Sequence, residues 1–111
     1  MTQKTITAKR GTLTSTATSL FTVPSGQICE IREIRLVNRG SAASDAYIAV
    51  GTSTSANTQV YRGVLQPATA GLEGTATSDA HTTVIPGESV YGWAAQANSV
   101  DYYISYVLVT V

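Results

Sequence analysis

The sequence predicts a small all-β protein with a single domain, an antiparallel β-sandwich or jelly-roll-like fold. Apolar and polar residues alternate along most of the 111-residue chain, and no window repeats apolar residues at the three- and four-residue spacing of a helix. Glycine, proline, serine and threonine interrupt this alternation at short intervals, as turns between strands do. Many short strands separated by such turns are typical of sandwiches and jelly rolls.

The strands are predicted from runs of alternating residues rich in valine, isoleucine, threonine and tyrosine. In chain order they span residues 5–9, 11–16, 19–23, 27–38, 46–51, 58–66, 81–86, 89–95 and 100–111. The segments expected to be loops, residues 38–46, 51–57 and 67–79, consist mostly of small and hydroxyl-bearing residues. We expect residues 1–10 to form an N-terminal arm and residues 11–111 to form the sandwich domain.

The longest predicted strand changes parity in its middle. Cys29 and Ile31 share one face by period-two counting, whereas Ile34 and Leu36 have the opposite parity. One extra residue near positions 32–33 returns all four apolar side chains to the same face, so the pattern predicts a β-bulge there. The charged residues of the strand then point outward or lie at the bend.

Two corners of similar composition flank the middle of the chain. "VPSG" at residues 23–26 and "IPGE" at residues 85–88 each combine a proline, which ends strand pairing, with a glycine suited to positive φ. They predict two equivalent turns.

Composition excludes several classes of partner. Charged residues make up 13% of the chain and the formal net charge is zero, so we expect neither nucleic acid nor membrane as a partner. The N-terminal "MTQKTITAKRG" lacks the apolar core of a signal peptide, and we expect synthesis in a host cytoplasm. Cys29 is the only cysteine, so an intrachain disulfide is impossible.

The residues that could support catalysis are few and scattered. His81 is the only histidine, and its neighbours Ser78 and Asp79 are too close in sequence to adopt the geometry of a catalytic triad. The carboxylates form no recognisable metal-binding motif. We therefore predict that the chain is not an enzyme and uses no metal or cofactor.

Aromatic residues provide a different kind of candidate. If Val90 points inward, Tyr91 and Trp93 point toward solvent or a partner, although a single tryptophan packed in the core is an equal alternative. In the outward case they could form a stacking platform for a glycan, with Gln96, Asn98 or Asp101 as hydrogen-bonding partners. The last strand is apolar on both faces, so another subunit or a second layer of the same domain should cover it.

Two long segments carry a resemblance to a known family. "TSLFTVPSGQICEIREIRLVNRGSAASDAYIAVG" and "VIPGESVYGWAAQANSVDYYISYVLV" resemble small virion proteins of tailed bacteriophages, in which a Val-Pro-x-Gly turn precedes a bent strand and a Pro-Gly corner precedes an aromatic closing strand. These motifs mark corners of a sandwich and not a site. The resemblance implies a β-sandwich structural protein of a phage particle.

Within that family the resemblance favours a capsid decoration (cement) protein, which stabilises the shell from the outer head surface as a trimer. The alternative is a tail, collar or head-fibre component that binds a host-surface glycan or receptor. We expect the major capsid protein or other virion subunits as partners and the virion as the location. The residues predicted to form the interface are Thr2, Lys4, Ile6, Lys9, Arg10, Tyr61, Tyr91, Trp93 and Tyr103.

Overall fold

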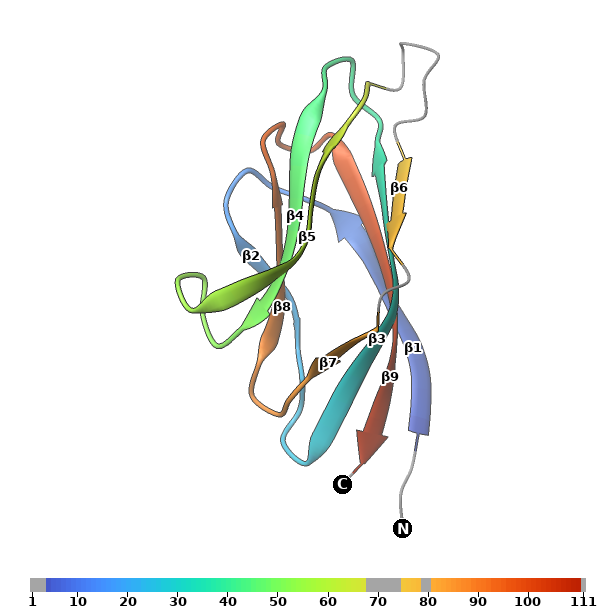
Figure 1. Cartoon of the computed structure of the whole chain (residues 1–111), viewed down its shortest axis with the longest axis vertical. Coiled ribbons are helices and arrows are strands. Elements are labelled where there is room, and N and C mark those ends of the chain that lie inside the picture. The colour runs from blue at the N-terminus through green and yellow to red at the C-terminus, as the bar shows by residue number, and fades with distance from the viewer. Residues whose placement is uncertain (1–3, 68–74, 79–80, 111) are drawn as a thin grey trace.

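The chain folds into strands joined by turns and loops (Figure 1). The computed structural model describes residues 4–67, 75–78 and 81–110, and within these ranges it contains no helix. The strands are β1 (Lys4–Thr12), β2 (Thr18–Thr22), β3 (Gln27–Asn38), β4 (Ser44–Gly51), β5 (Asn57–Leu65), β6 (Thr75–Ser78), β7 (Thr82–Val84), β8 (Ser89–Ala94) and β9 (Val100–Thr110).

The strands form two antiparallel sheets that face each other. Sheet A has the order β1-β9-β3-β6, with β7 also paired to β3, and sheet B has the order β2-β8-β4-β5. If β6 and β7 are taken as two parts of one interrupted strand, the first strand pairs with the last, the second with the next to last, and so on inward to β4 and β5. This nested pairing is that of a jelly roll, so the predicted all-β sandwich is confirmed.

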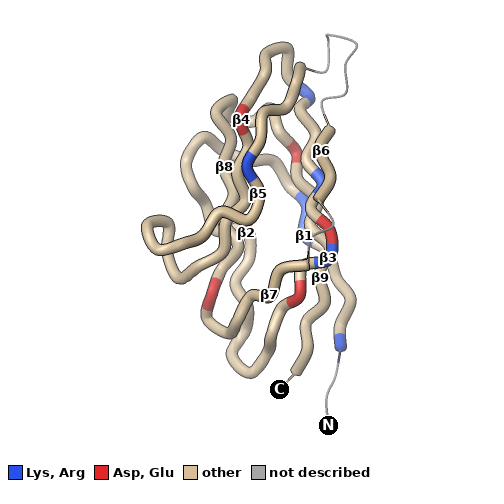
Figure 2. The backbone as a smooth tube through the Cα atoms, viewed as in Figure 1, with Lys and Arg blue, Asp and Glu red and all other residues tan. Residues whose placement is uncertain are grey.

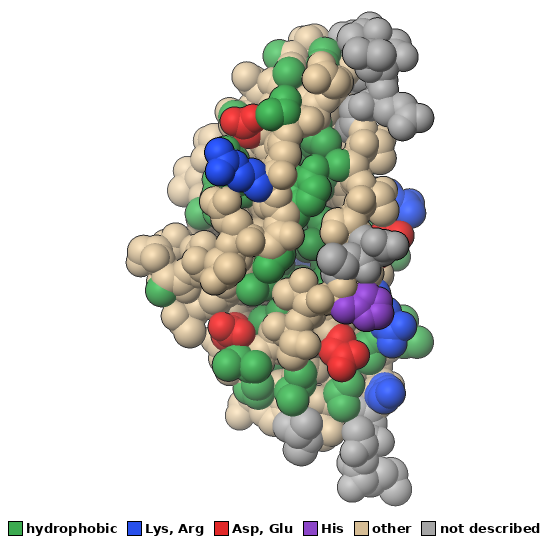
Figure 3. Space-filling model, viewed as in Figure 1, with side chains coloured by type: hydrophobic (Ala, Val, Ile, Leu, Met, Phe, Trp, Pro, Cys, Tyr) green, Lys and Arg blue, Asp and Glu red, His purple; other side chains and the backbone are tan. Residues whose placement is uncertain are grey.

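The hydrophobic core lies between the two sheets. Its fully buried residues include Leu13, Ile31, Leu36, Ile48, Val84, Val90, Val100 and Ile104. Phe21 of sheet B stacks on Tyr106 of sheet A with ring centroids 4.3 Å apart, which joins the layers near one end. Figure 3 looks onto the edge of the sandwich, where hydrophobic side chains are visible along the seam between the sheets.

The predicted bulge in β3 is confirmed. The pairing of β3 with β9 shifts between Ile31 and Glu33, which leaves Arg32 as the extra residue. Cys29, Ile31, Ile34 and Leu36 are all buried in consequence, while Glu30, Arg32 and Arg35 are exposed. The parity change in the sequence is therefore a real structural feature of the longest strand.

The two predicted corners lie side by side. Gly26 and Gly87 both have positive φ, 81° and 86°, which glycine adopts without steric cost. The backbone N–H of Val23 donates to the carbonyl of Glu88 at 2.9 Å, and the N–H of Gly87 donates to the carbonyl of Val23 at 3.2 Å. These bonds tie the β2–β3 turn to the β7–β8 turn.

Two strand assignments from the sequence are wrong. The separate strands predicted at 5–9 and 11–16 are one strand that ends at Thr12, because Leu13 turns into the core, where its N–H donates to the carbonyl of Val100. The predicted loop 67–79 contains β6, because Thr75–Ser78 pair with Ile34–Val37 of β3. The remainder of that loop, residues 68–74 and 79, lies outside the described residues.

The predicted N-terminal arm is described from Lys4 onward. From Lys4 to Arg10 it belongs to β1, which pairs with β9 of the same chain along its whole length. The division between arm and domain stays a prediction, but in this structure the segment forms the edge of sheet A.

Candidate functional site

Metal-ligating side chains do not cluster in the described residues. No group of three or more histidine, cysteine, aspartate or glutamate side chains among them could hold a metal ion. His81 is exposed and precedes β7, whereas Ser78 ends β6 in a half-buried position. Asp79 lies outside the described residues. The candidate sites are therefore the outer surfaces of the two sheets.

The outer face of sheet A carries most of the positive charge. All lysines and arginines except Arg62 lie on β1, on β3 or directly after β3, as Figure 2 shows by the blue segments on these strands. On this face, Lys4, Ile6 and Arg10 pair in register with Val109, Val107 and Tyr103 of β9. The face combines cations with a central apolar strand.

In the half of this face near the start of β9, the charged side chains contact other side chains of the same chain. The Arg39 Nε donates to Asp101 at 2.6 Å, and the Thr12 hydroxyl donates to the other carboxylate oxygen at 2.8 Å. The Arg10 guanidinium lies 5.5 Å from the centroid of the Tyr103 ring, a cation–π distance. These contacts cover the outer side of β9 near its start.

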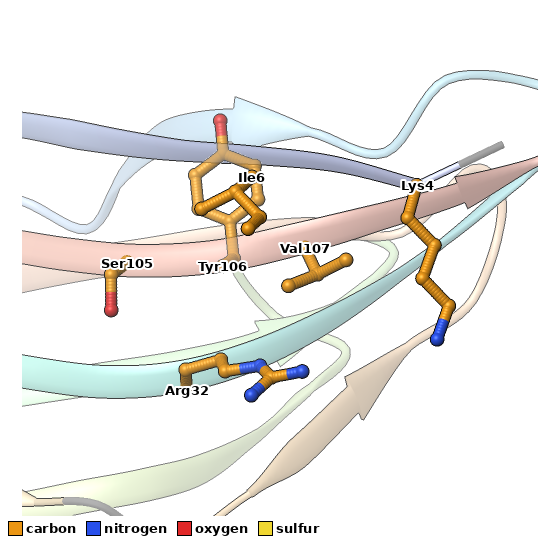
Figure 4. A pocket seen from close by; sticks show the side chains of 6 residues that line it. All are labelled: Lys4, Ile6, Arg32, Ser105, Tyr106 and Val107. Carbon is orange, nitrogen blue, oxygen red and sulfur yellow. The ribbon is translucent and has the colours of Figure 1, made fainter.

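The other half of the face forms a shallow apolar pocket of about 290 Å³. Ile6, Val107, Lys4 and Arg32 line it together with Ser105 and Tyr106. In Figure 4, Lys4 of β1 and Arg32 of β3 flank Val107 of β9. Ile6 is 84% exposed, whereas Val107 is buried although it points away from the core. From the sequence, another subunit or a second layer was expected to cover this apolar side of β9. In the structure, the long cationic side chains of the neighbouring strands β1 and β3 border it.

The outer face of sheet B contains a ladder of aromatic and cationic side chains across three strands. Tyr47 of β4 pairs in register with Arg62 of β5 on one side and with Trp93 of β8 on the other. The Tyr47 and Trp93 rings are stacked with centroids 5.0 Å apart, and the Arg62 guanidinium lies 5.8 Å from the Tyr47 centroid. Both faces of the Tyr47 ring are therefore occupied. Beside the ladder, Asp45 and Val64 help line a pocket of about 220 Å³.

The structure does not assemble the predicted glycan platform. Tyr91 and Trp93 do point away from the core, as the parity of Val90 indicates, but Tyr91 is only 7% exposed between Ser19 and Ala49. Trp93 is half-buried, and one face of its ring lies on Tyr47.

The proposed polar partners of that platform lie elsewhere. Asp101 belongs to sheet A, where Arg39 and Thr12 occupy its carboxylate oxygens. Gln96 and Asn98 are exposed in the connection between β8 and β9. These residues are close to Trp93 in sequence but do not share a face with it, because β8 and β9 are in different sheets.

The remaining predicted interface residues fall into different environments. Lys4, Ile6, Lys9 and Arg10 are exposed on β1, and Tyr103 is half-buried beside Arg10. Tyr61 instead packs against the core from β5, and burial raises the pKa of its phenol. Thr2 lies outside the described residues.

Sequence reasoning missed several residues of these surfaces. Tyr47 and Arg62 were not singled out, because cross-strand neighbours between β4 and β5 depend on register. Arg32 was recognised only as part of the bulge, although that position brings it to the pocket beside Val107. The pattern of alternation identified outward positions but not their neighbours on adjacent strands.

Comparisons with solved structures identify proteins of similar fold. A pilus protein of Bacillus endospore appendages matches with a TM-score of 0.61 and 14% identity, covering 99% of this chain and 88% of that one. A chain from the acid-stable capsid of Helicobacter pylori bacteriophage KHP30 matches with a TM-score of 0.53 and 20% identity, covering 97% and 92%. The core of the Drosophila protein NLP, which is described as forming a pentamer and binding histones, matches with a TM-score of 0.50 and 14% identity, covering 94% and 95%.

No protein-family model matches the chain, and no curated protein matches its sequence. Within the described residues there is also no helix that could cross a membrane. At these identities the structural likenesses establish the fold alone. That fold, a two-sheet sandwich, is shared by a pilus protein, a capsid protein and a pentamer-forming protein.

Proposed function

We propose that this chain is a structural subunit of a virus particle. The observation that carries the proposal is the nested jelly-roll pairing of its strands, an arrangement that recurs in viral capsid domains. The similarity to a phage capsid chain over nearly the full length of both supports it. So does the position of the pockets in the described part of the chain, which lie on the faces of the two sheets.

A disulfide-linked assembly is less compatible with this chain than a capsid. The pilus proteins that share the fold are described as disulfide-linked. Here the only cysteine, Cys29, is fully buried in the core, and burial raises the pKa of its thiol from 9.0 to about 12. A buried, protonated thiol is a poor nucleophile for forming a bond between subunits. Assembly would therefore depend on non-covalent contacts.

More specifically, we propose a capsid decoration protein that binds other virion subunits from the outer surface of the head. The exposed apolar side chain of Ile6, the cations beside it and the open edge of β1 are the surface best suited to docking. Many copies with modest contacts would stabilise the shell by multivalent binding. A homotrimer and the absence of enzymatic and cofactor-dependent activity remain part of the proposal.

Quantitative mass spectrometry of purified virus particles from the source of the sequence tests this role. The expected result is a copy number equal to that of the major capsid protein, or a simple lattice fraction of it. Absence from purified particles would contradict the proposal. Native mass spectrometry of the purified chain tests the trimer, which a purely monomeric spectrum at micromolar concentration would contradict.

The alternative of a fibre or tail component with a glycan site receives less support. A stacking platform needs an exposed ring face, whereas Tyr91 is buried and both faces of Tyr47 are covered. A few copies per particle, together with glycan-array binding that Trp93→Ala abolishes, would favour this alternative over decoration.

A further inference from the structure

The four edges of the two sheets differ in how well they are protected against pairing with another strand. β2 has five residues and a register shift beside Leu20, and β6 and β7 have only four and three residues. β5 is longer but has a register shift at Val60. Charged side chains on an edge strand can block edge-to-edge pairing, and short strands and bulges block it through their geometry.

β1 lacks both of the geometric protections. It has nine residues, contains no proline, and pairs with β9 in an unbroken register from Lys4–Val109 to Thr12–Asp101. Among the described strands, β9 is its only hydrogen-bonded neighbour, and Figure 1 shows β1 at the margin of its sheet. Its residues are exposed or half-exposed throughout. The outer edge of β1 is therefore a long, regular template for an additional strand.

The charge of β1 selects which strand could bind. β1 carries Lys4, Lys9 and Arg10 and no acidic residue. Pairing with β1 of a second copy would bring two strongly cationic strands together, which is unfavourable. An acidic strand would instead form favourable cross-strand pairs with the same side chains.

We propose that β1 accepts an extended acidic strand from a partner protein by β-augmentation. The strand would lie antiparallel to β1, with carboxylates opposite Lys4 and Arg10, an aliphatic residue opposite Ile6 and a small residue opposite Ala8. Lys4 and Arg10 are six positions apart on one face, about 20 Å at the rise of a β-strand. The partner sequence is therefore acidic, small, aliphatic and acidic at alternate positions.

The neighbouring surface favours this occupant. Ile6, which lines the pocket together with Val107, Lys4 and Arg32, is exposed at this edge, and the aliphatic side chain of the added strand can pack beside it. Arg10 lies over Tyr103, which positions its guanidinium without using a carboxylate of this chain. The inference extends the proposed virion role, since it names the chemistry of the partner segment that the surface would bind.

The test uses the full chain labelled with ¹⁵N and two synthetic peptides. The probe is acetyl-Glu-Thr-Ala-Thr-Val-Thr-Glu-amide, and its matched control replaces both glutamates with lysine. We expect the acidic peptide to shift the amide resonances of residues 4–12 and to bind at least about tenfold more tightly than the lysine peptide. No binding, equal binding of the two peptides, or shifts centred on β5 would overturn the proposal.

Charge-reversed variants test the recognition itself. Lys4→Glu combined with Arg10→Glu should weaken binding of the acidic peptide about tenfold or more and reverse the preference between the peptides. Arg62→Glu, on the edge strand of the other sheet, is the matched control and should leave binding unchanged. Thermal unfolding shows whether the charge-reversed variant is folded. If it is not, the double variant Lys4→Gln with Arg10→Gln removes the charges without reversing them.

Two further results would count against the proposal. Unchanged peptide binding in both double variants would contradict it. A dimer in sedimentation that becomes tighter in the charge-neutral variant, where repulsion between two β1 strands is relieved, would mean that a second copy occupies the edge. Because the peptide assay needs no virus particle, its failure is distinguishable from failure of the proposed virion role, which the copy number decides.

Discussion

The outer faces of the two sheets differ in how their side chains are used. On sheet B, Arg62, Tyr47 and Trp93 lie against one another across three strands, and Tyr91 is almost fully buried. On sheet A, Ile6 is 84% exposed, and the cations Lys4 and Arg32 border a shallow pocket. Sheet B thus covers much of its outer face with its own side chains, although Val64 on its edge strand is exposed, whereas sheet A leaves apolar and cationic groups available.

This difference shows that exposed aromatics are not by themselves a binding surface. The rings on sheet B contact each other and a guanidinium, so much of their interaction capacity is used within the chain. The most exposed large hydrophobic residue in the described part of the chain is instead Ile6, on an edge strand. Sheet A is therefore the better candidate for contacts with other molecules.

The largest expected effect is a difference in the free energy of unfolding between substitutions on the inner and on the outer side of sheet A. Ile104 is fully buried on β9, so Ile104→Ala should lower the free energy of unfolding by about 2–5 kcal/mol through lost burial and a cavity. Ile6→Ala should change it by less than about 0.5 kcal/mol, because Ile6 is already mostly in water. Urea unfolding measures both. A large loss for Ile6→Ala would mean that β1 contributes to stability through its outer face.

The next prediction concerns the buried thiol of Cys29 on β3. The pKa of Cys29 is about 12 in the folded chain and 9.0 as its ordinary value, so the unfolded chain loses its proton first as pH rises. The free energy of unfolding should therefore fall between pH 9 and 12, by up to about 1.4 kcal/mol per pH unit from this group.

Cys29→Val keeps a similar volume and removes the titrating thiol, so it should make this decline shallower. Burial also raises the pKa of Tyr102 and Tyr106, and these groups contribute a decline that the variant retains. Chemical unfolding at several pH values measures the difference in slope. Identical slopes in the two proteins would show that the thiol does not titrate differently on folding.

A smaller effect tests the ladder on sheet B. The stacked Tyr47 and Trp93 rings should show a coupling free energy of about 0.5–1.5 kcal/mol in a double-mutant cycle of Tyr47→Ala and Trp93→Ala. The matched cycle of Tyr47→Ala with Tyr103→Ala joins residues on different sheets and should give additive effects. Additivity in both cycles would contradict the view that sheet B covers its own face.

The smallest effect concerns the ion pair on sheet A. Arg39 and Asp101 are both exposed, so Asp101→Asn should lower the free energy of unfolding by less than about 1 kcal/mol although the contact is 2.6 Å long. The loss should shrink further in about 1 M salt, where screening is strong. A loss that is large and independent of salt would place this pair among the structural contacts of the fold.

The sequence by itself determined the features that depend on local pattern. Alternation identified the all-β class, the parity change in residues 27–38 located the bulge near positions 32–33, and the glycines of the two corners marked the turns with positive φ. Each of these follows from side-chain direction or backbone sterics within a few residues. Residues 75–78 were misassigned because a short run of threonine, alanine and serine carries little pattern of its own.

Only the tertiary structure decided which residues share a surface. β6 exists through its pairing with β3, Tyr47 meets Arg62 and Trp93 through the register of three strands, and Asp101 is separated from Trp93 because consecutive strands enter different sheets. The same topology makes β1 an edge by pairing the first strand with the last. These contacts join residues far apart in sequence, and a pattern of period two determines the face of a strand but not its neighbour.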